Sequence, residues 1–333
     1  MGLTLAGLTF LSTSCRKDLC YDHDEHGWSV KVNLSSDWEQ EWERAYTYDW
    51  EELWEEDWKH DYDDLRPAPA DGIRVQVYTS DGQRMESNLP DEGGRVAMPA
   101  GTHELQFYSN DTEYIVFGGV AASESATATT RGVTRSSYRE LHAGERTVNQ
   151  PDMLYGAYME EYTAEKTLVP TELPVTLRPL VYTYMIRYEF ESGQQYVALA
   201  RGALAGMAET VYLNDGHTGE NAATVLFDCT LVDYGAEALA QSFGVPDYPG
   251  EHYGRGDTDG RRYSLNLEVR MVNGKFKTFE FDVTDQVKGQ PRGGVIVVSG
   301  LSISDDEGLE GGGSFDVDVD GWGEWVDIPL PLD

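Results

Sequence analysis

The chain has 333 residues and a formal net charge of −34, from 59 acidic and 25 basic residues. A charge of this sign and size repels nucleic acid and anionic membrane surfaces, so we exclude both as binding partners. The length allows two domains of ordinary size, each with its own core. Three cysteines are too few for a disulfide framework.

The beginning of the chain is typical of a lipoprotein signal peptide. An apolar run over residues 3–11 is followed by three small residues and then by Cys15. The run is too short to cross a bilayer, although no Lys or Arg precedes it as in most signal peptides. We therefore predict a signal peptide over residues 1–14, lipid attachment at Cys15 and a polar tether over 15–27. The lipid would hold the rest of the chain as a water-soluble body at a membrane surface.

Residues 37–66 form an unusual insert in which an aromatic residue recurs every fourth position among thirteen acidic residues. On a helix, a four-residue step turns about 400°, so these side chains wind around the axis instead of keeping one face. The simplest interpretation is an acidic, helical insertion between two strands, with its aromatic residues partly packed on the sandwich that contains it. The alternatives are disorder, or a surface that binds a sugar or a basic peptide. The candidate binding residues are Trp38, Trp42, Tyr46, Trp50, Trp54 and Trp58.

The rest of the chain has the pattern of an all-β protein, with short alternating segments separated by turns. Residues 73–78 alternate cleanly, and Asn273-Gly274 predicts a tight hairpin. Residues 196–206 predict one short helix or a turn across a sheet. Prolines after residue 168 mark a domain boundary. We therefore predict an N-terminal β-sandwich over 28–168, which holds the insert, and a C-terminal β-sandwich over 169–333.

Four aspartates near the C-terminus match part of a calcium-binding loop. Asp316, Asp318 and Asp320 have the spacing of its first half, and Asp327 falls at the twelfth position. Calcium would need these carboxylates to converge from a curled loop. Valines alternate with the aspartates, which favours an extended strand, so calcium is the less favoured alternative and no other cofactor is expected.

Several motifs along the chain resemble a known family. They are Cys15-Arg-Lys-Asp-Leu, Pro99-Ala-Gly-Thr, Tyr108-Ser-Asn-Asp-Thr-Glu, Leu177-Arg-Pro-Leu, Phe281-Asp-Val-Thr-Asp-Gln-Val and Gly313-Ser-Phe-Asp-Val-Asp-Val-Asp-Gly-Trp. With them the chain resembles the DUF5119 lipoproteins of Bacteroides-type bacteria, which are similar to the fimbrillin and fimbrial-anchor superfamily. The resemblance implies two tandem transthyretin-like, or fimbrillin-like, β-sandwiches at the outer-membrane surface. By analogy, the partners would be pilin subunits, or host or glycan ligands.

No catalytic motif is visible, since the chain lacks a Gly-x-Ser-x-Gly elbow, a His-Glu-x-x-His pair and a phosphate-binding glycine loop. We expect no enzyme but a surface lipoprotein with a structural or adhesive role, as a fimbrial anchor or accessory subunit. A glycan- or protein-binding module that uses the insert is the second hypothesis, and a hydrolase is the third. If the protein joins a pilus, we expect the contact to be β-strand addition.

Overall fold

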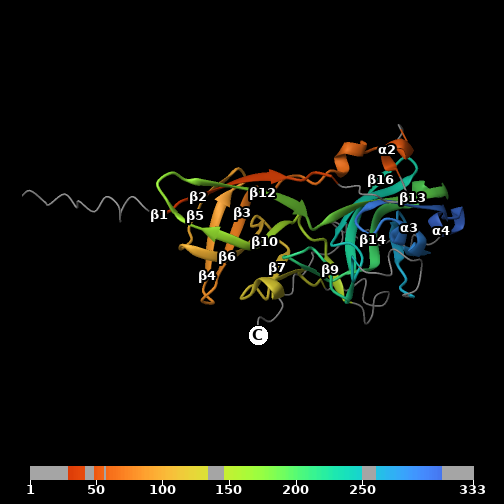
Figure 1. The fold of residues 1–333 in the computed structure, drawn as a ribbon. Helices are drawn as coiled ribbons and strands as arrows, with labels where there is room; N and C mark the ends of the chain where they lie inside the picture. The colour runs from red at the N-terminus through yellow and green to blue at the C-terminus, as the bar shows by residue number, and fades with distance from the viewer. Residues whose placement is uncertain (1–28, 42–48, 56–57, 134–145, 250–259, 310–333) are drawn as a thin grey trace, which may run out of the picture.

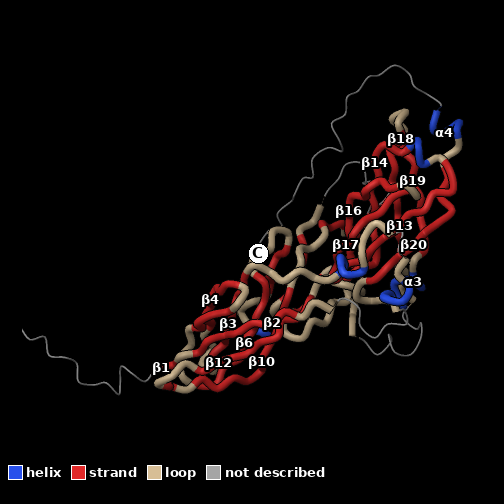
Figure 2. Tube along the Cα trace, turned by 90° about the horizontal axis from the view of Figure 1, so that it is seen from above, coloured by secondary structure: helices blue, strands red, loops and turns tan. Residues whose placement is uncertain are grey.

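The computed structural model describes residues 29–41, 49–55, 58–133, 146–249 and 260–309. In this part of the chain the molecule is an elongated body made mainly of strands (Figure 1). The first described residues, from 29 on, lie at one end of the body, and the strands of the second half of the chain lie at the other (Figure 2). None of the described helices is long and apolar enough to cross a membrane.

The first sandwich is built from one folded sheet of seven strands, in the order β4-β3-β6-β10-β12-β2-β5. Both halves of this sheet contribute to a single core, which includes Leu34, Val75 and Leu177. Along the chain its strands are β2 (Val32–Trp38), β3 (Gly72–Thr79), β4 (Arg84–Pro90), β5 (Gly93–Val96), β6 (Gly101–Ser109), β10 (Tyr155–Ala164) and β12 (Thr171–Pro179). A two-stranded ladder of β1 (Ser29–Val30) and β11 (Lys166–Thr167) lies at the end of this sandwich.

The position of β12 differs from the predicted boundary near residue 168. This strand pairs in parallel with β2, from Thr171 beside Val32 to Leu177 beside Trp38. Its alternate residues Leu173, Val175 and Leu177 are buried in the first core. Alternation of apolar residues is typical of a half-buried strand, and the prolines do not interrupt it. Sheet pairing therefore assigns residues 171–179 to the first sandwich.

The second sandwich contains eight strands, in the order β19-β18-β14-β16-β17-β13-β20 with β9 beside β16. Its core includes Tyr184, Ile186, Leu265 and Leu267. The strands are β9 (Thr147–Asn149), β13 (Tyr182–Ser192), β14 (Val197–Ala208), β16 (Ala222–Val232), β17 (Gly235–Ser242), β18 (Ser264–Met271), β19 (Phe276–Asp282) and β20 (Gly294–Ser302). The prediction of an all-β protein with two tandem β-sandwiches is confirmed.

The hairpin predicted at Asn273-Gly274 is confirmed as the connection between β18 and β19. The Oδ1 atom of Asn273 accepts a hydrogen bond from the backbone N–H of Lys275 at 3.0 Å. Gly274 has a φ of +83°, which glycine adopts without strain. The turn residues therefore set the register of this hairpin, as their sequence indicates.

The helix or turn predicted over residues 196–206 is wrong, because this segment belongs to the central strand β14. Its alanines and leucines favour a helix, but pairing with β16 on one side and β18 on the other overrides that preference. Small residues suit this position, since a Cβ at Gly202 would lie 2.1 Å from the Phe227 ring. The side chains of β14 are small because bulky side chains of the neighbouring strands, such as Phe227, fill the core beside them.

The described part of the acidic insert is not one continuous helix. It contains the four-residue helix α2 (Trp50–Leu53) and the 3₁₀ turn η1 (Tyr62–Leu65), joined by irregular chain. Although the insert connects β2 to β3 of the first sandwich, its aromatic side chains pack against residues of β13, β17 and β20 in the second. The insert thus packs on its own domain only through Trp38, whereas the apolar partners of its later aromatic residues are Met185, Leu239, Val295 and Val297.

A third core joins the two sandwiches. A small sheet in the order β15-β8-β7 lies between them, made of β7 (Ile115–Gly118), β8 (Thr127–Thr130) and β15 (Thr210–Tyr212). Its residues pack with Leu154, Leu180 and Phe243, which come from connections that leave both sandwiches. The remaining short helical elements are η2 (Ser123–Ser125), η4 (Gln194–Tyr196), α3 (Thr284–Gly289) and α4 (Asp305–Leu309).

Helix α4 is attached to β19 through Glu307, and this contact predicts a pH dependence. The Lys277 ammonium donates to its carboxylate at 2.8 Å and Ser304 N–H donates at 2.9 Å, which lowers the pKa of Glu307 to about 2. Because the folded pKa lies below the ordinary value of 4.5, the contact stabilises α4 above that pH and is lost as the pH falls toward 2. We expect Lys277→Met to raise the pKa of Glu307, as measured by a carboxyl NMR titration. An unchanged midpoint would refute this assignment.

Candidate functional site

The two strands at the bend of the first sheet separate and leave a gap. β10 and β12 pair only where Tyr155 meets Pro179 and Gly156 meets Arg178. Beyond this point β10 remains bonded to β6 and β12 remains bonded to β2 on their other edges. In the described part of the chain, two strand edges therefore face each other without a ladder between them.

Hydrogen bonds on the far edges identify the backbone groups that face this gap. Thr171 N–H donates to the Lys31 carbonyl at 2.8 Å, and Glu39 N–H donates to the Leu177 carbonyl at 2.9 Å, so odd-numbered residues of β12 face β2. Because backbone groups alternate sides along a strand, Thr176 faces the gap. Pro174 faces it too but has no N–H to offer.

The same argument applies to β10. Tyr155 N–H donates to Ser109 Oγ on the side of β6, at 2.8 Å. Because backbone groups alternate sides along the strand, Ala157 faces β6 as Tyr155 does. Tyr158, three residues after Tyr155, presents its backbone groups to the gap. Tyr158 and Thr176 therefore each present an N–H and a C=O group that a further strand between β10 and β12 could bond.

The gap contains a cavity of about 310 Å³. Ala157 and Met159 of β10 are half-buried and pack against the first core. The turn at residues 213–216, which follows β15 of the small sheet, contributes to the lining together with Leu180. This groove, which we call the β10–β12 groove, thus combines apolar side chains with unpaired backbone groups on both sides. Such a surface suits an extended peptide that adds as a strand.

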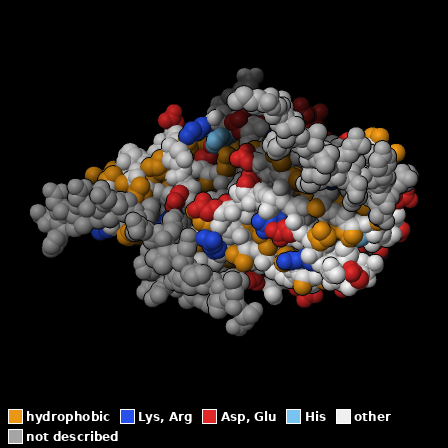
Figure 3. Space-filling view, turned by 90° about the vertical axis from the view of Figure 1, so that its left-hand side faces the viewer, with side chains coloured by type: hydrophobic (Ala, Val, Ile, Leu, Met, Phe, Trp, Pro, Cys, Tyr) orange, Lys and Arg blue, Asp and Glu red, His pale blue; other side chains and the backbone are white. Residues whose placement is uncertain are grey.

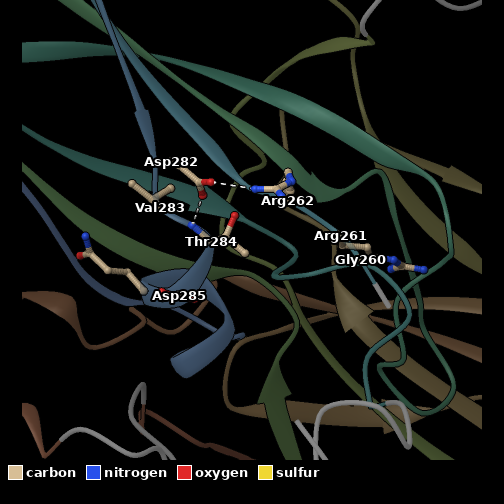
Figure 4. A pocket seen from close by; sticks show the side chains of 8 residues that line it. Gly260, Arg261, Arg262, Asp282, Val283, Thr284 and Asp285 are labelled. Atoms are coloured by element: carbon tan, nitrogen blue, oxygen red, sulfur yellow. Dashed lines mark hydrogen bonds and ion pairs between the residues drawn. The ribbon is translucent and has the colours of Figure 1, made fainter. Parts of the chain in front are cut away.

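A second cavity, of about 640 Å³, lies at the start of α3 and is lined mainly by polar residues. Asp282 is bonded to Arg262 at 3.1 Å and accepts the Thr284 N–H at 3.0 Å (Figure 4). The hydrogen bonds from Thr284, with the Arg262 charge, lower the pKa of Asp282. The Asp282 carboxylate thus joins the start of α3 to Arg262 in the lining of this cavity.

The aromatic residues of the insert that were predicted as binding residues are used for packing where they are described. Trp54 lies 4.6 Å from Trp58 and Trp50 lies 6.4 Å from Trp58, between ring centroids. Trp38 ends β2 and meets Tyr155 edge to face at 4.9 Å. Trp42 and Tyr46 lie outside the described residues. A role of this set in binding a sugar or a basic peptide stays a prediction.

Beneath the insert lies a buried charge network that sequence reasoning missed. The Arg187 guanidinium lies 4.7 Å from the Trp58 ring centroid and 4.1 Å from that of Tyr234. Glu237, which is 1% exposed, bonds Arg187 at 3.4 Å and His60 at 3.1 Å. Burial, with the hydrogen bond to Glu237, raises the pKa of Tyr234. The available signal was an arginine inside the otherwise apolar segment 182–188.

Other predicted site residues lie outside the described part of the chain. They are the lipidation candidate Cys15 and the calcium candidates Asp316, Asp318, Asp320 and Asp327. Among the residues that the structure describes, no three His, Cys, Asp or Glu side chains are grouped as a metal site. Cys229 is a free thiol on β16 whose pKa is raised by burial.

The described surface carries both signs of charge despite the net charge of −34. On the face shown in Figure 3, acidic, basic and hydrophobic side chains are interspersed. On that face, charges of one sign do not gather into a single patch. Recognition through the shape and the backbone groups of a groove is therefore better supported than recognition through a charged surface.

Comparisons with known proteins agree with this architecture. A candidate fimbrium-anchoring subunit of Bacteroides ovatus, Fim4B, is 22% identical over 98% of this chain and 96% of its own length. A crystal structure of a candidate adhesin from the same species, 19% identical, superposes with a TM-score of 0.56 over 90% of this chain and 99% of its own. That structure has the same fold. The model of DUF5119, a domain of unknown function, matches residues 44–228, more than half of the chain. This chain therefore belongs to the DUF5119 family.

Proposed function

We propose that this protein is an anchoring or accessory subunit of a fimbrium at the cell surface. The observation that carries the proposal is the similarity to Fim4B, which extends over 98% of this chain and 96% of the relative. A shared function is better supported when both domains and their order match than when one module does. The relation to a candidate adhesin of the same fold is consistent with it.

The β10–β12 groove provides the contact in this proposal. An extended segment of a fimbrial subunit would bond the backbone groups of Tyr158 and Thr176 and place alternate side chains against Ala157 and Met159. Backbone pairing supplies affinity, and the alternating side chains fix the register. The third core holds the two sandwiches together. A pulling force on a fimbrial segment bound in the groove would therefore be distributed over both sandwiches.

Attachment to the cell belongs to the same proposal. Lipid on Cys15 would hold the protein in the outer membrane, and the polar tether over 15–27 would let the first sandwich stand away from the lipid surface. We propose a structural role and no catalysis, since the relatives are described as anchoring and adhesive proteins. Replacing Cys15 with alanine should release the protein into the medium, as detected by immunoblotting of cell and supernatant fractions.

A deletion strain tests the proposed function. Without an anchoring subunit, fimbriae should be shed, so fimbrial protein should move from the cell fraction to the culture medium. The wild-type gene supplied in trans should return it to the cells. Fimbriae that remain attached and unchanged in length and number in the deletion strain would contradict the proposal.

A further inference from the structure

Two glutamine side chains close the outer edge of β20, whose only strand partner in the described part of the chain is β13. Val297 N–H donates to Gln286 Oε1 at 2.9 Å, and Gln286 Nε2 donates back to the Val297 carbonyl at 3.0 Å. Gln290 repeats this at Val295, whose N–H donates to its Oε1 at 3.0 Å while its Nε2 donates to the Val295 carbonyl. A carboxamide carries the donor and acceptor of a peptide group, so the outward backbone groups of Val295 and Val297 are bonded as a neighbouring strand would bond them.

The local structure is adapted to this contact. Gln290 is 1% exposed, and a Cβ at Gly294 would lie 2.0 Å from its Oε1 atom. Gly294 also has a φ of +144°, so only glycine suits this position. The sequence around Asp282, Thr284 and Val287, one of the motifs noted above, starts α3 and fixes it in the second core. This motif thus places Gln286 over the edge.

The insert covers the face of the same strand. Val295 and Val297 pack with Trp50, Trp54 and Trp58, so their side chains are shielded as well as their backbone groups. Trp50 Nε1 also donates to Gln290 Oε1 at 3.0 Å. One face and the outer edge of β20 are therefore closed together, by the insert and α3.

The composition of β20 would allow its edge to pair with another chain if the glutamines did not cover it. Residues 294–302 contain no charge and no proline, and four of the nine are Val or Ile. An exposed edge of this kind pairs with other chains. The opposite edge strand of the sheet, β19, carries Lys277, Glu280 and Asp282, and such charges protect an edge by themselves.

We propose that Gln286 and Gln290 are edge-blocking residues that keep β20 from pairing with β20 of a second copy of this chain. Identical strands can pair antiparallel about a two-fold axis. Val295 of each copy would then lie opposite Val297 of the other. In this register, the N–H and C=O groups of Val295 and Val297, which the glutamines bond in the monomer, would bond the other copy instead. An uncharged strand brings no like-charge repulsion into the pair, unlike the acidic surface elsewhere.

The double variant Gln286→Ala/Gln290→Ala tests this inference in the full chain. At concentrations low enough to keep this variant monomeric, backbone amide exchange of Val295 and Val297 should become about 5- to 10-fold faster, as expected for the loss of one hydrogen bond each. Light scattering after gel filtration should show dimers at concentrations where the wild type is monomeric. Gln195→Ala, at an exposed glutamine of the same sandwich, is the matched control and should change neither readout.

A third substitution identifies the contact. Val297→Pro in the double variant removes the outward N–H but leaves Ile296 and Val298 to pair with β13, so it should return the protein to a monomer. Circular dichroism checks that each variant is folded. A folded double variant that remains monomeric at all concentrations would overturn the proposal, and so would dimers that persist after Val297→Pro. Trp50→Phe keeps the ring but loses its donor, and should speed exchange at Val295 alone.

Discussion

Replacing Arg187 with alanine is expected to lower the free energy of unfolding by about 3–5 kcal/mol. The guanidinium is almost fully buried, lies between the Trp58 and Tyr234 rings and neutralises Glu237. Its removal leaves a buried carboxylate whose only remaining basic neighbour among the described contacts is His60. Urea unfolding followed by tryptophan fluorescence measures the loss, and Trp58 reports the site directly.

Two controls separate the buried charge from general effects of losing an arginine. Arg262 bonds Asp282 at 3.1 Å on the surface, with 81% of its side chain exposed, so Arg262→Ala should cost less than about 1 kcal/mol. Replacing both Arg187 and Glu237 with leucine should recover much of the loss, because no charge is left unpaired. Equal destabilisation by Arg187→Ala and Arg262→Ala would contradict the importance assigned to the buried network.

Replacing Thr176 with proline is expected to reduce retention of fimbriae on the cell by about 10-fold or more, which is the order of effect of losing one or two good hydrogen bonds in a binding site. Proline removes the N–H that β12 presents to the β10–β12 groove. The ladder to β2 should survive, since it uses the neighbouring odd-numbered residues. Fimbrial protein in the cell and medium fractions of the complemented deletion strain gives the measurement.

Thr176→Ala is the matched control, because it removes the exposed side chain but keeps the backbone donor. It should retain fimbriae like the wild type. Thermal unfolding of the purified variants tests whether proline damages the sandwich itself. Loss of retention by both variants, or by neither, would argue against strand addition at this groove.

Much of the fold could be predicted because a strand with one buried face has alternating apolar and polar residues in the sequence. Residues 73–78 and the Asn273-Gly274 hairpin are examples in which local pattern and final structure agree. The segment 197–208 was misjudged because both of its faces are buried, so alternation is absent and helix-forming alanines dominate. The boundary predicted near residue 168 lies too early because proline usually interrupts a strand, whereas Pro174 faces a gap where no N–H is bonded.

The site was harder to predict than the fold. A gap between two strands depends on where the sheet bends, and no residue at Tyr158 or Thr176 signals this locally. The aromatic repeat of the insert was noticed, but sequence could not tell that its rings would meet Met185 and Val295 in the other sandwich. Such contacts join residues more than 100 positions apart and follow only from the packing of whole domains.

The most direct test of the proposed anchoring function is photo-cross-linking on living cells. A benzophenone amino acid placed at Met159, inside the β10–β12 groove, should cross-link to a fimbrial subunit, which mass spectrometry of the product would identify. The same group at Glu92, on an exposed turn of the first sandwich, should give no such product. Cross-linking to fimbrial protein from Met159 alone is the predicted result. Absence of any fimbrial adduct from Met159 on fimbriated cells would contradict the account.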